Sequence, residues 1–234
     1  SVNEEVRNLT ARNHTATHLL QKALKTVLGP HVEQAGAYYD DKRLRFDFTH
    51  FTALTKEELK KVEELVNEEI ARGDVVKTEE MSLEDAKKSG ATALFGEKYG
   101  DRVRVVSVGD FSIELCGGTH VNQSGSIQGF KILSEQGIAA GVRRIEALTS
   151  RNLFDYFQRE EDLLKELSGK LKSDPEHLLQ KVESLEQELK ASKSDLDKLK
   201  EKIAKEEMGE LKAETINGCS VIIKELQGVD SNGL

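Results

Sequence analysis

The chain has 234 residues, enough for one sizeable domain and an appended segment, because domains usually span roughly 100 to 200 residues. Charged residues make up 32% of it and the formal net charge is -8, which disfavours a membrane protein and a non-specific binder of nucleic-acid phosphates. No apolar run approaches the roughly 20 residues of a membrane span, and no secretory leader opens the sequence, so we expect a cytoplasmic protein. It begins at Ser1 without a methionine, and we expect a piece of a longer protein.

The first expected element is an amphipathic helix over 12–28. Its apolar residues recur at intervals of three and four until a Gly-Pro pair ends the pattern. His14 and His18 lie one turn apart in this helix, so their rings project from the same face.

Strands and helices then follow one another up to residue 150. A hairpin turns at 40–41, and the next helix carries Thr55 and Glu58 as a capping box. A strand and a short helix capped by Ser82 come next, and the remaining expected strands are 103–108, 111–115 and two more between 127 and 149. This order predicts an α+β domain over 1–150, mainly an antiparallel sheet packed by helices.

After Ser150 the composition shifts to Leu, Glu and Lys. Two helices are expected in 151–212. The first ends near residue 172, the second spans about 176–208, and a Ser-Asp-Pro sequence separates them. The second helix carries a heptad seam, so we expect an antiparallel, coiled-coil-like helical hairpin, or alternatively a homodimer formed through it. A strand expected at 219–223 predicts that 213–234 is the truncated start of a C-terminal α/β domain.

A second metal-ligand signal lies about a hundred residues after the two histidines. Cys116 and His120 form a C-x-x-x-H pattern at a strand end, and Gly117 and Gly118 between them permit tight backbone. Three imidazoles and one thiolate suit a tetrahedral Zn²⁺ site. Two histidines one turn apart on a helix are more often surface residues, and a lone cysteine is more often a core residue. The two pairs together nevertheless favour one metal site formed by His14, His18, Cys116 and His120.

Several blocks of sequence resemble a known family, the bacterial-type editing domain of alanyl-tRNA synthetase. They are RNHTATHLLQKAL, HVEQAGAYYDDKRLRFDFTH, TALFGEKYGDRVRVVSVGDFSIELCGGTHV and GIAAGVRRIEALTS, in the correct order and over nearly all of residues 7–150. The resemblance implies a hydrolase that cleaves the ester joining a wrongly attached serine or glycine to tRNA(Ala). It also implies zinc on the four residues above and, after residue 150, the linker and the opening of the C-terminal domain. On this resemblance we expect the aminoacylation module to lie outside this chain.

The resemblance also implies roles for residues beside the metal. Thr17 and Gln34 match positions that line the amino-acid pocket. Thr17 lies on the face of His14, although a helical threonine often bonds its own backbone instead, and Gln34 suits an exposed hairpin position equally well.

Two further residues, Arg143 and Gly141, match a segment near the bound end of the tRNA. Here too a structural alternative stays open, because Arg143 or Arg144 can pair with Glu135 or Glu146. Glu114 and Asp47 are near the motifs, but the sequence assigns neither as a general base.

Two other functions remain open. In one, the zinc is structural and the chain is a tRNA-binding or dimerising module without activity of its own. In the other, the chain is a free-standing trans-editing protein, which the helical segment and the truncated last domain disfavour.

Overall fold

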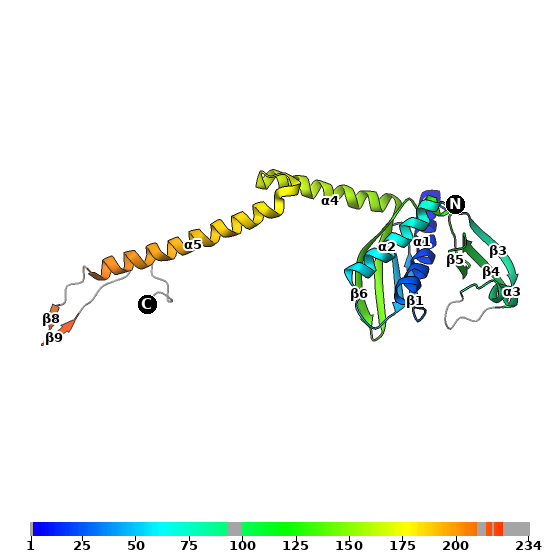
Figure 1. Cartoon of the computed structure of the whole chain (residues 1–234), viewed down its shortest axis with the longest axis horizontal. Helices are drawn as coiled ribbons and strands as arrows, with labels where there is room; N and C mark the ends of the chain where they lie inside the picture. The colour runs from blue at the N-terminus through cyan, green and yellow to red at the C-terminus, as the bar shows by residue number, and fades with distance from the viewer. Residues whose placement is uncertain (1, 93–99, 210–213, 217, 222–234) are drawn as a thin grey trace. The chain divides into compact units, whose positions relative to one another are not determined.

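The computed structural model describes residues 2–92, 100–209, 214–216 and 218–221, which are the coloured parts of Figure 1. The chain divides into two compact units, Ser1–Glu161 and Asp162–Leu234. Among the described residues, no helix has both the length and the apolarity needed to cross a membrane.

The long first helix α1, Glu4–Leu28, carries two of the candidate ligands. It begins eight residues earlier than the apolar pattern predicts, because Asn3 caps it by accepting hydrogen bonds from the backbone of Glu5 and Val6. Its middle part is buried, and its polar residues there include His14 and His18.

A four-stranded antiparallel sheet in the order β1-β2-β7-β6 forms the larger part of the first unit. Its strands are β1 Gln34–Tyr39, β2 Leu44–Thr49, β6 Phe130–Ala139 and β7 Val142–Thr149. The main core lies between this sheet and the helices α1 and α2, with fully buried Leu19, Phe46 and Val62 at its centre. Helix α2, Lys56–Arg72, has the capping box expected at its start.

A second sheet, in the order β3-β4-β5, is also antiparallel and lies across α1 from the first (Figure 1). Its elements are β3 Val76–Ser82, the Ser82-capped helix α3 Leu83–Lys88, β4 Arg102–Val108 and β5 Ser112–Leu115. A small separate core, which includes Ala86, Val103 and Leu115, holds α3 on this sheet. The 3-10 helix η1, Ser124–Ile127, then leads back to β6. The expected strands and helices of 1–150 are thus present, and the α+β class is confirmed.

Two helices follow the sheets, as the sequence predicts. They are α4 Ser150–Leu171 and α5 Leu178–Gly209, with the 3-10 helix η2 Pro175–His177 between them. The boundary of the two units falls within α4.

The heptad seam of α5 is exposed in the single chain. Apart from buried Leu178, the exposed fractions of its side chains run from 38% at Leu185 to 60% at Leu199. The other members of the seam are Val182, Leu189, Leu196 and Ile203. The expected antiparallel packing of one helix on the other is therefore not seen in the described residues, and a partner for the seam stays a prediction.

Only short strands are described beyond α5. The strands β8 Glu214–Ile216 and β9 Cys219–Val221 form an antiparallel pair. The last two residues of the expected 219–223 strand lie outside the described residues, as does most of the expected third domain.

Candidate metal centre

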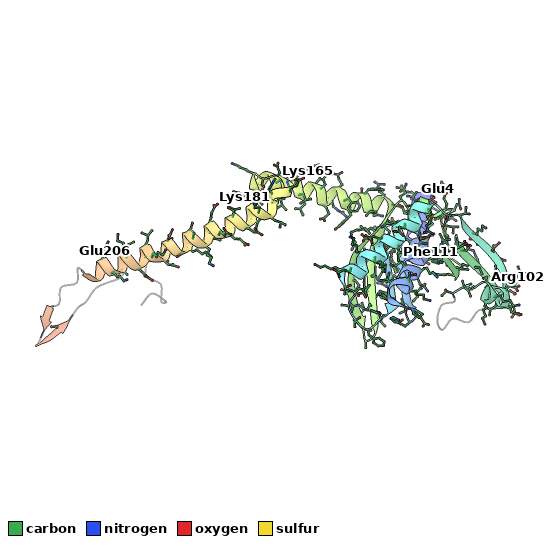
Figure 2. All side chains as sticks on the ribbon, in the orientation of Figure 1. Glu4, Arg102, Phe111, Lys165, Lys181 and Glu206 are labelled. Carbon is green, nitrogen blue, oxygen red and sulfur yellow. The ribbon has the colours of Figure 1, made fainter. Side chains whose placement is uncertain are left out.

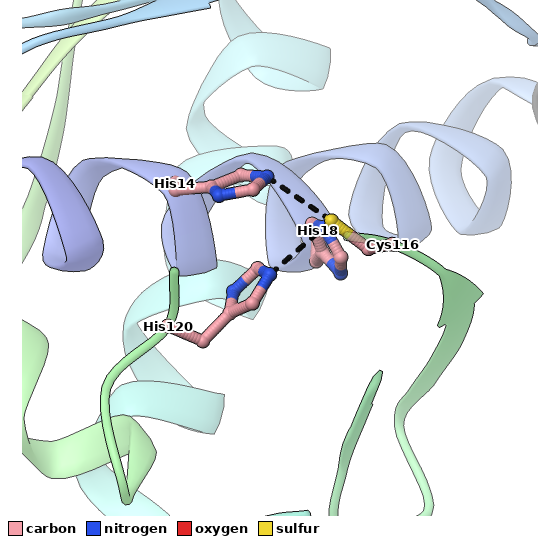
Figure 3. A group of neighbouring side chains, drawn as sticks. All are labelled: His14, His18, Cys116 and His120. Atoms are coloured by element: carbon pink, nitrogen blue, oxygen red, sulfur yellow. Dashed lines mark hydrogen bonds between the residues drawn. The ribbon is translucent and has the colours of Figure 1, made fainter. Parts of the chain in front are cut away.

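The four residues singled out in the sequence meet in the structure. Their ligand atoms lie within 4.8 Å of one another, with His14 and His18 projecting from α1, Cys116 just after β5 and His120 in the following loop (Figure 3). The Cys116 Sγ lies 3.4 Å from His14 Nε2 and 3.3 Å from His120 Nε2. Tetrahedral Zn²⁺ with ordinary bond lengths places sulfur and nitrogen ligands about 3.5 Å apart, so the cluster has the dimensions of such a site.

Hydrogen bonds on the outer side of two histidines set their tautomers. His14 Nδ1 lies 3.2 Å from the Thr119 carbonyl oxygen, which can only accept, so this nitrogen carries the hydrogen. Thr15 Oγ1 lies 3.1 Å from His120 Nδ1 and already donates its one hydrogen to the Ala11 carbonyl at 2.9 Å. It must therefore accept from His120. The Nε2 lone pairs of both rings are left free and face Cys116.

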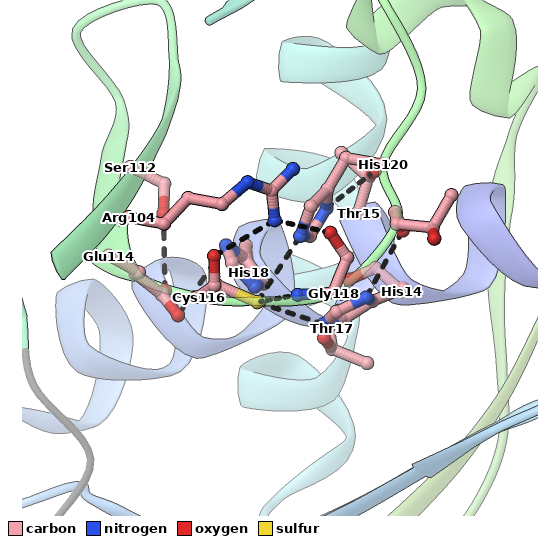
Figure 4. Close-up of polar contacts among 11 residues, drawn as sticks. His14, Thr15, Thr17, His18, Arg104, Ser112, Glu114, Cys116, Gly118 and His120 are labelled. Atoms are coloured by element: carbon pink, nitrogen blue, oxygen red, sulfur yellow. Dashed lines mark hydrogen bonds and ion pairs between the residues drawn. The ribbon is translucent and has the colours of Figure 1, made fainter. Parts of the chain in front are cut away.

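The third histidine has a carboxyl group on its outer side. His18 Nδ1 is buried and lies 3.6 Å from Glu114 Oε2, slightly beyond hydrogen-bond distance. Ser112 Oγ donates to the other oxygen of Glu114 at 3.2 Å and so orients the carboxyl group toward His18 (Figure 4). This is the position from which a carboxyl group orients a metal-bound imidazole.

Burial keeps the histidines of the cluster neutral. Desolvation is the largest cause that lowers the pKa of His14 to about 4, that of His18 to about 3 and that of His120 to about 2, and the neighbouring histidines of the cluster contribute to the last two. Near pH 7 all three rings therefore offer lone pairs, as metal ligation requires. Desolvation also raises the pKa of the Glu114 carboxyl to about 8.

The glycines of the loop matter because the His14 ring lies directly against the backbone. A Cβ on Gly118 would lie 2.1 Å from His14 Cε1, whereas one on Gly117 would meet nothing within 4 Å. A further constraint on the ring is Tyr39, which stacks on it with centroids 3.9 Å apart and planes 10° apart. Arg104 fixes the loop by donating to the carbonyl oxygens of Cys116 and Gly118 (Figure 4).

A pocket of about 470 Å³ opens over the cluster, between β1 of the first sheet and β4 and β5 of the second. Thr17 and Gln34 both line it, as does Glu114. The Thr17 hydroxyl donates to its own helix, to the His14 carbonyl at 2.7 Å, so the local bond that the sequence left open is formed. Its oxygen can still accept a hydrogen bond from a group in the pocket.

The other two expected residues are not among those that line this pocket. Arg143 forms a double hydrogen bond to Glu135, the partner on the neighbouring strand that the sequence offered. Arg144 forms a bidentate pair with Asp47 at 2.7 and 2.8 Å, which occupies that carboxylate. A role for Arg143 and Gly141 at the tRNA end stays a prediction.

Three residues were given no role at the metal centre from the sequence: Thr15, Tyr39 and Arg104. A threonine inside a helix and a tyrosine in a strand give no signal of their own. Arg104 and Arg102 alternate on one face of β4, a pattern that is typical of exposed strand residues.

Comparisons with known proteins give matches over the whole chain. Residues 103–146 match a family described as the second additional domain of threonyl and alanyl tRNA synthetases. Alanine–tRNA ligase 1 of Lachnoclostridium phytofermentans is 55% identical over 100% of the chain, and alanine–tRNA ligase of Acetivibrio thermocellus 48% identical over the same share. That of Francisella philomiragia is 50% identical over 98% of it. The chain spans about a quarter of the length of these relatives, 26% to 27%.

Proposed function

Since the chain resembles a segment of bacterial alanine–tRNA ligases over its whole length, we propose that it hydrolyses the ester of tRNA(Ala) carrying serine or glycine. The observation that carries the proposal is the four-ligand cluster at the base of a pocket of about 470 Å³, a volume suited to a small ligand. Such a site has a chemical purpose. A synthetic pocket sized for alanine cannot exclude the smaller glycine and penalises an added hydroxyl weakly, so a second, hydrolytic site must remove the errors.

The metal proposed for the cluster is Zn²⁺, held by His14, His18, Cys116 and His120. A thiolate with three imidazoles is a donor set that zinc accepts, and the neutral rings and inward Nε2 lone pairs support the fit. When bound, zinc supplies a Lewis acid that positions or polarises the aminoacyl group.

Residues beside the cluster are proposed to hold the amino acid. Thr17 Oγ1 has given its hydrogen to the helix, so it accepts a hydrogen bond from a seryl hydroxyl or an α-ammonium group. Gln34, at the start of β1, presents an amide that can both donate and accept. Glu114 is proposed to orient His18. In the hydrolysis, water adds its oxygen to the acyl carbon, and the ribose oxygen leaves with a proton.

A cysteine substitution tests the proposal, because the described cluster uses one of the 2 cysteines of the chain. Cys116→Ala removes a ligand, so zinc content and the hydrolysis of seryl-tRNA(Ala) should both be lost. The matched control is Cys219→Ala, which should keep both. Full hydrolysis and full zinc content in Cys116→Ala would refute the assignment.

A second candidate function concerns α5, whose exposed seam favours association of two copies through 151–212. In this reading the zinc is structural, and the chain binds tRNA(Ala) as a dimer without hydrolysing anything. Leu189→Glu with Leu196→Glu in the whole chain places charges on the seam. Sedimentation equilibrium should then report a monomer for the variant and a dimer for the wild type. A wild-type chain that is monomeric at all concentrations tested would contradict association through the seam of α5.

A further inference from the structure

Three adjoining hollows surround the loop that carries the cluster. The first is the pocket of about 470 Å³ already described, and the second, of about 320 Å³, shares Arg104, Gly117 and Gly118 with it. A third, of about 250 Å³, shares Arg7 and His120 with the second. Because each hollow shares residues with the next, the three lie side by side from the cluster, past the loop, to the first turns of α1, and we call them together the groove.

The charge of this groove is opposite to that of the whole chain. Four arginines line it, while the buried Glu114 is the one carboxyl group among the described lining residues. The chain as a whole carries a net charge of -8. The four are Arg7, Arg12, Arg102 and Arg104.

None of these arginines is neutralised by a carboxylate in the part of the chain that the structure describes. Arg12 donates to the Gln128 side chain at 3.1 Å and to Ser150 Oγ at 3.2 Å, both uncharged. Arg104 donates to backbone carbonyl oxygens. Arg7 and Arg102 are exposed and form no ion pair with a described residue (Figure 2 labels Arg102, at the start of β4). Elsewhere in the same unit, arginines such as Arg143 and Arg144 are paired with acids.

We propose that this arginine groove binds the phosphate backbone of a single-stranded RNA 3′ end and leads its terminal aminoacyl group to the cluster. The inference rests on the proposed function and names the part of the substrate that each side chain contacts. Arg102 and Arg104 line the hollow above the cluster, so they face the last phosphates, and Arg7 faces a phosphate further from the end. Guanidinium groups suit this task because they bind phosphate oxygens bidentately.

The loop between these arginines favours a strand that lies close to the backbone. Gly117 has open space where a Cβ would lie, so a ribose or phosphate can approach the chain there. Several charges along a groove suit a linear polyanion, whereas a single phosphate needs them gathered at one point.

The test is the binding of RNA to the whole chain with Arg7→Gln and Arg102→Gln combined. Both side chains are exposed, so the fold should not change, and far-ultraviolet circular dichroism verifies this. The probe is a fluorescently labelled RNA stem-loop with an unpaired 3′ strand, titrated at several salt concentrations. The control, Arg72→Gln, removes an exposed arginine of α2 that is not among the groove's lining residues.

We expect the double variant to bind at least about tenfold more weakly, since each arginine loses a charge-assisted hydrogen bond. The slope of log affinity against log salt should fall by about 0.7 for each phosphate that the variant no longer neutralises. Arg72→Gln should leave both unchanged, and Arg7→Lys with Arg102→Lys should keep most of the salt slope. If the double variant keeps the RNA affinity and the salt slope of the wild type, the proposed role of the groove is refuted. It is also refuted if Arg72→Gln lowers the RNA affinity by as much as the double variant does.

Hydrolysis of seryl-tRNA(Ala) separates the groove from the proposed function. If the double variant binds RNA as the wild type does while the wild type hydrolyses the ester, the proposal that the groove binds RNA is wrong and the proposed function stands. If RNA binding depends on these arginines and the wild type hydrolyses nothing, the groove stands and the function is wrong.

Discussion

Replacement of Gly118 by alanine should weaken metal binding strongly by steric contact alone. The added Cβ would lie 2.1 Å from His14 Cε1 and 2.6 Å from Nδ1, so the ring must move by about 1.3 Å to restore ordinary contact. Tyr39 stacks on the ring, and the Thr119 carbonyl holds Nδ1, which limits where the ring can go. Metal-ligand distances tolerate only about 0.2 Å. We therefore expect His14 to leave the ligand set and zinc affinity to fall at least about 100-fold, or about 2.7 kcal/mol.

The neighbouring glycine supplies the control. A Cβ on Gly117 meets nothing within 4 Å, so Gly117→Ala should bind zinc as the wild type does. Affinity is measured by competition with a chromogenic zinc chelator at pH 7. The reasoning is refuted if Gly118→Ala binds zinc with wild-type affinity, or if both alanine variants lose it equally.

Two further predictions concern the support and the protonation of the cluster. Thr15→Val removes the acceptor for His120 Nδ1 and should weaken zinc binding about 10- to 100-fold. The control is Thr26→Val, which removes a similar hydrogen bond to the helix backbone at an exposed site and should leave zinc affinity unchanged. Equal zinc affinities of the two variants would contradict the tautomer assignment. The metal-free protein should lose stability as the pH falls below about 6.5, because its histidines keep lowered pKa values while those of the unfolded chain take up protons. From pH 7 to 5 the free energy of unfolding should fall by up to about 2 kcal/mol for each histidine of the cluster. Because His120→Asn has one such histidine fewer, its free energy of unfolding, measured with urea, should fall less. An unfolding free energy that does not fall between these values contradicts the neutral-histidine account.

Local patterns predicted most of the fold and the ligand set. Periodicity and caps located the helices, since the capping box of Thr55 with Glu58 and the cap at Ser82 form as expected. The i, i+4 spacing on a helix and the glycine-containing C-x-x-x-H pattern predicted two half-sites, and the structure brings them together. The comparisons confirm the resemblance to bacterial alanyl-tRNA synthetase.

What the sequence did not reveal depends on contacts between distant elements. Thr15 supports His120 across 105 residues of sequence, and Tyr39 reaches His14 from another element, so neither follows from a local pattern. The pairing of Arg144 with Asp47 depends on the register of β2 with β7. The seam of α5 has the spacing of a coiled coil, but spacing alone does not say which chain covers it.

The most direct test of the account is zinc content measured together with the hydrolysis of seryl-tRNA(Ala), on the whole chain before chelation, after it and after zinc is restored. The account predicts one zinc per chain on the single described cluster, with hydrolysis lost on chelation and recovered with zinc. Hydrolysis that continues at full rate after the zinc has been removed would contradict it.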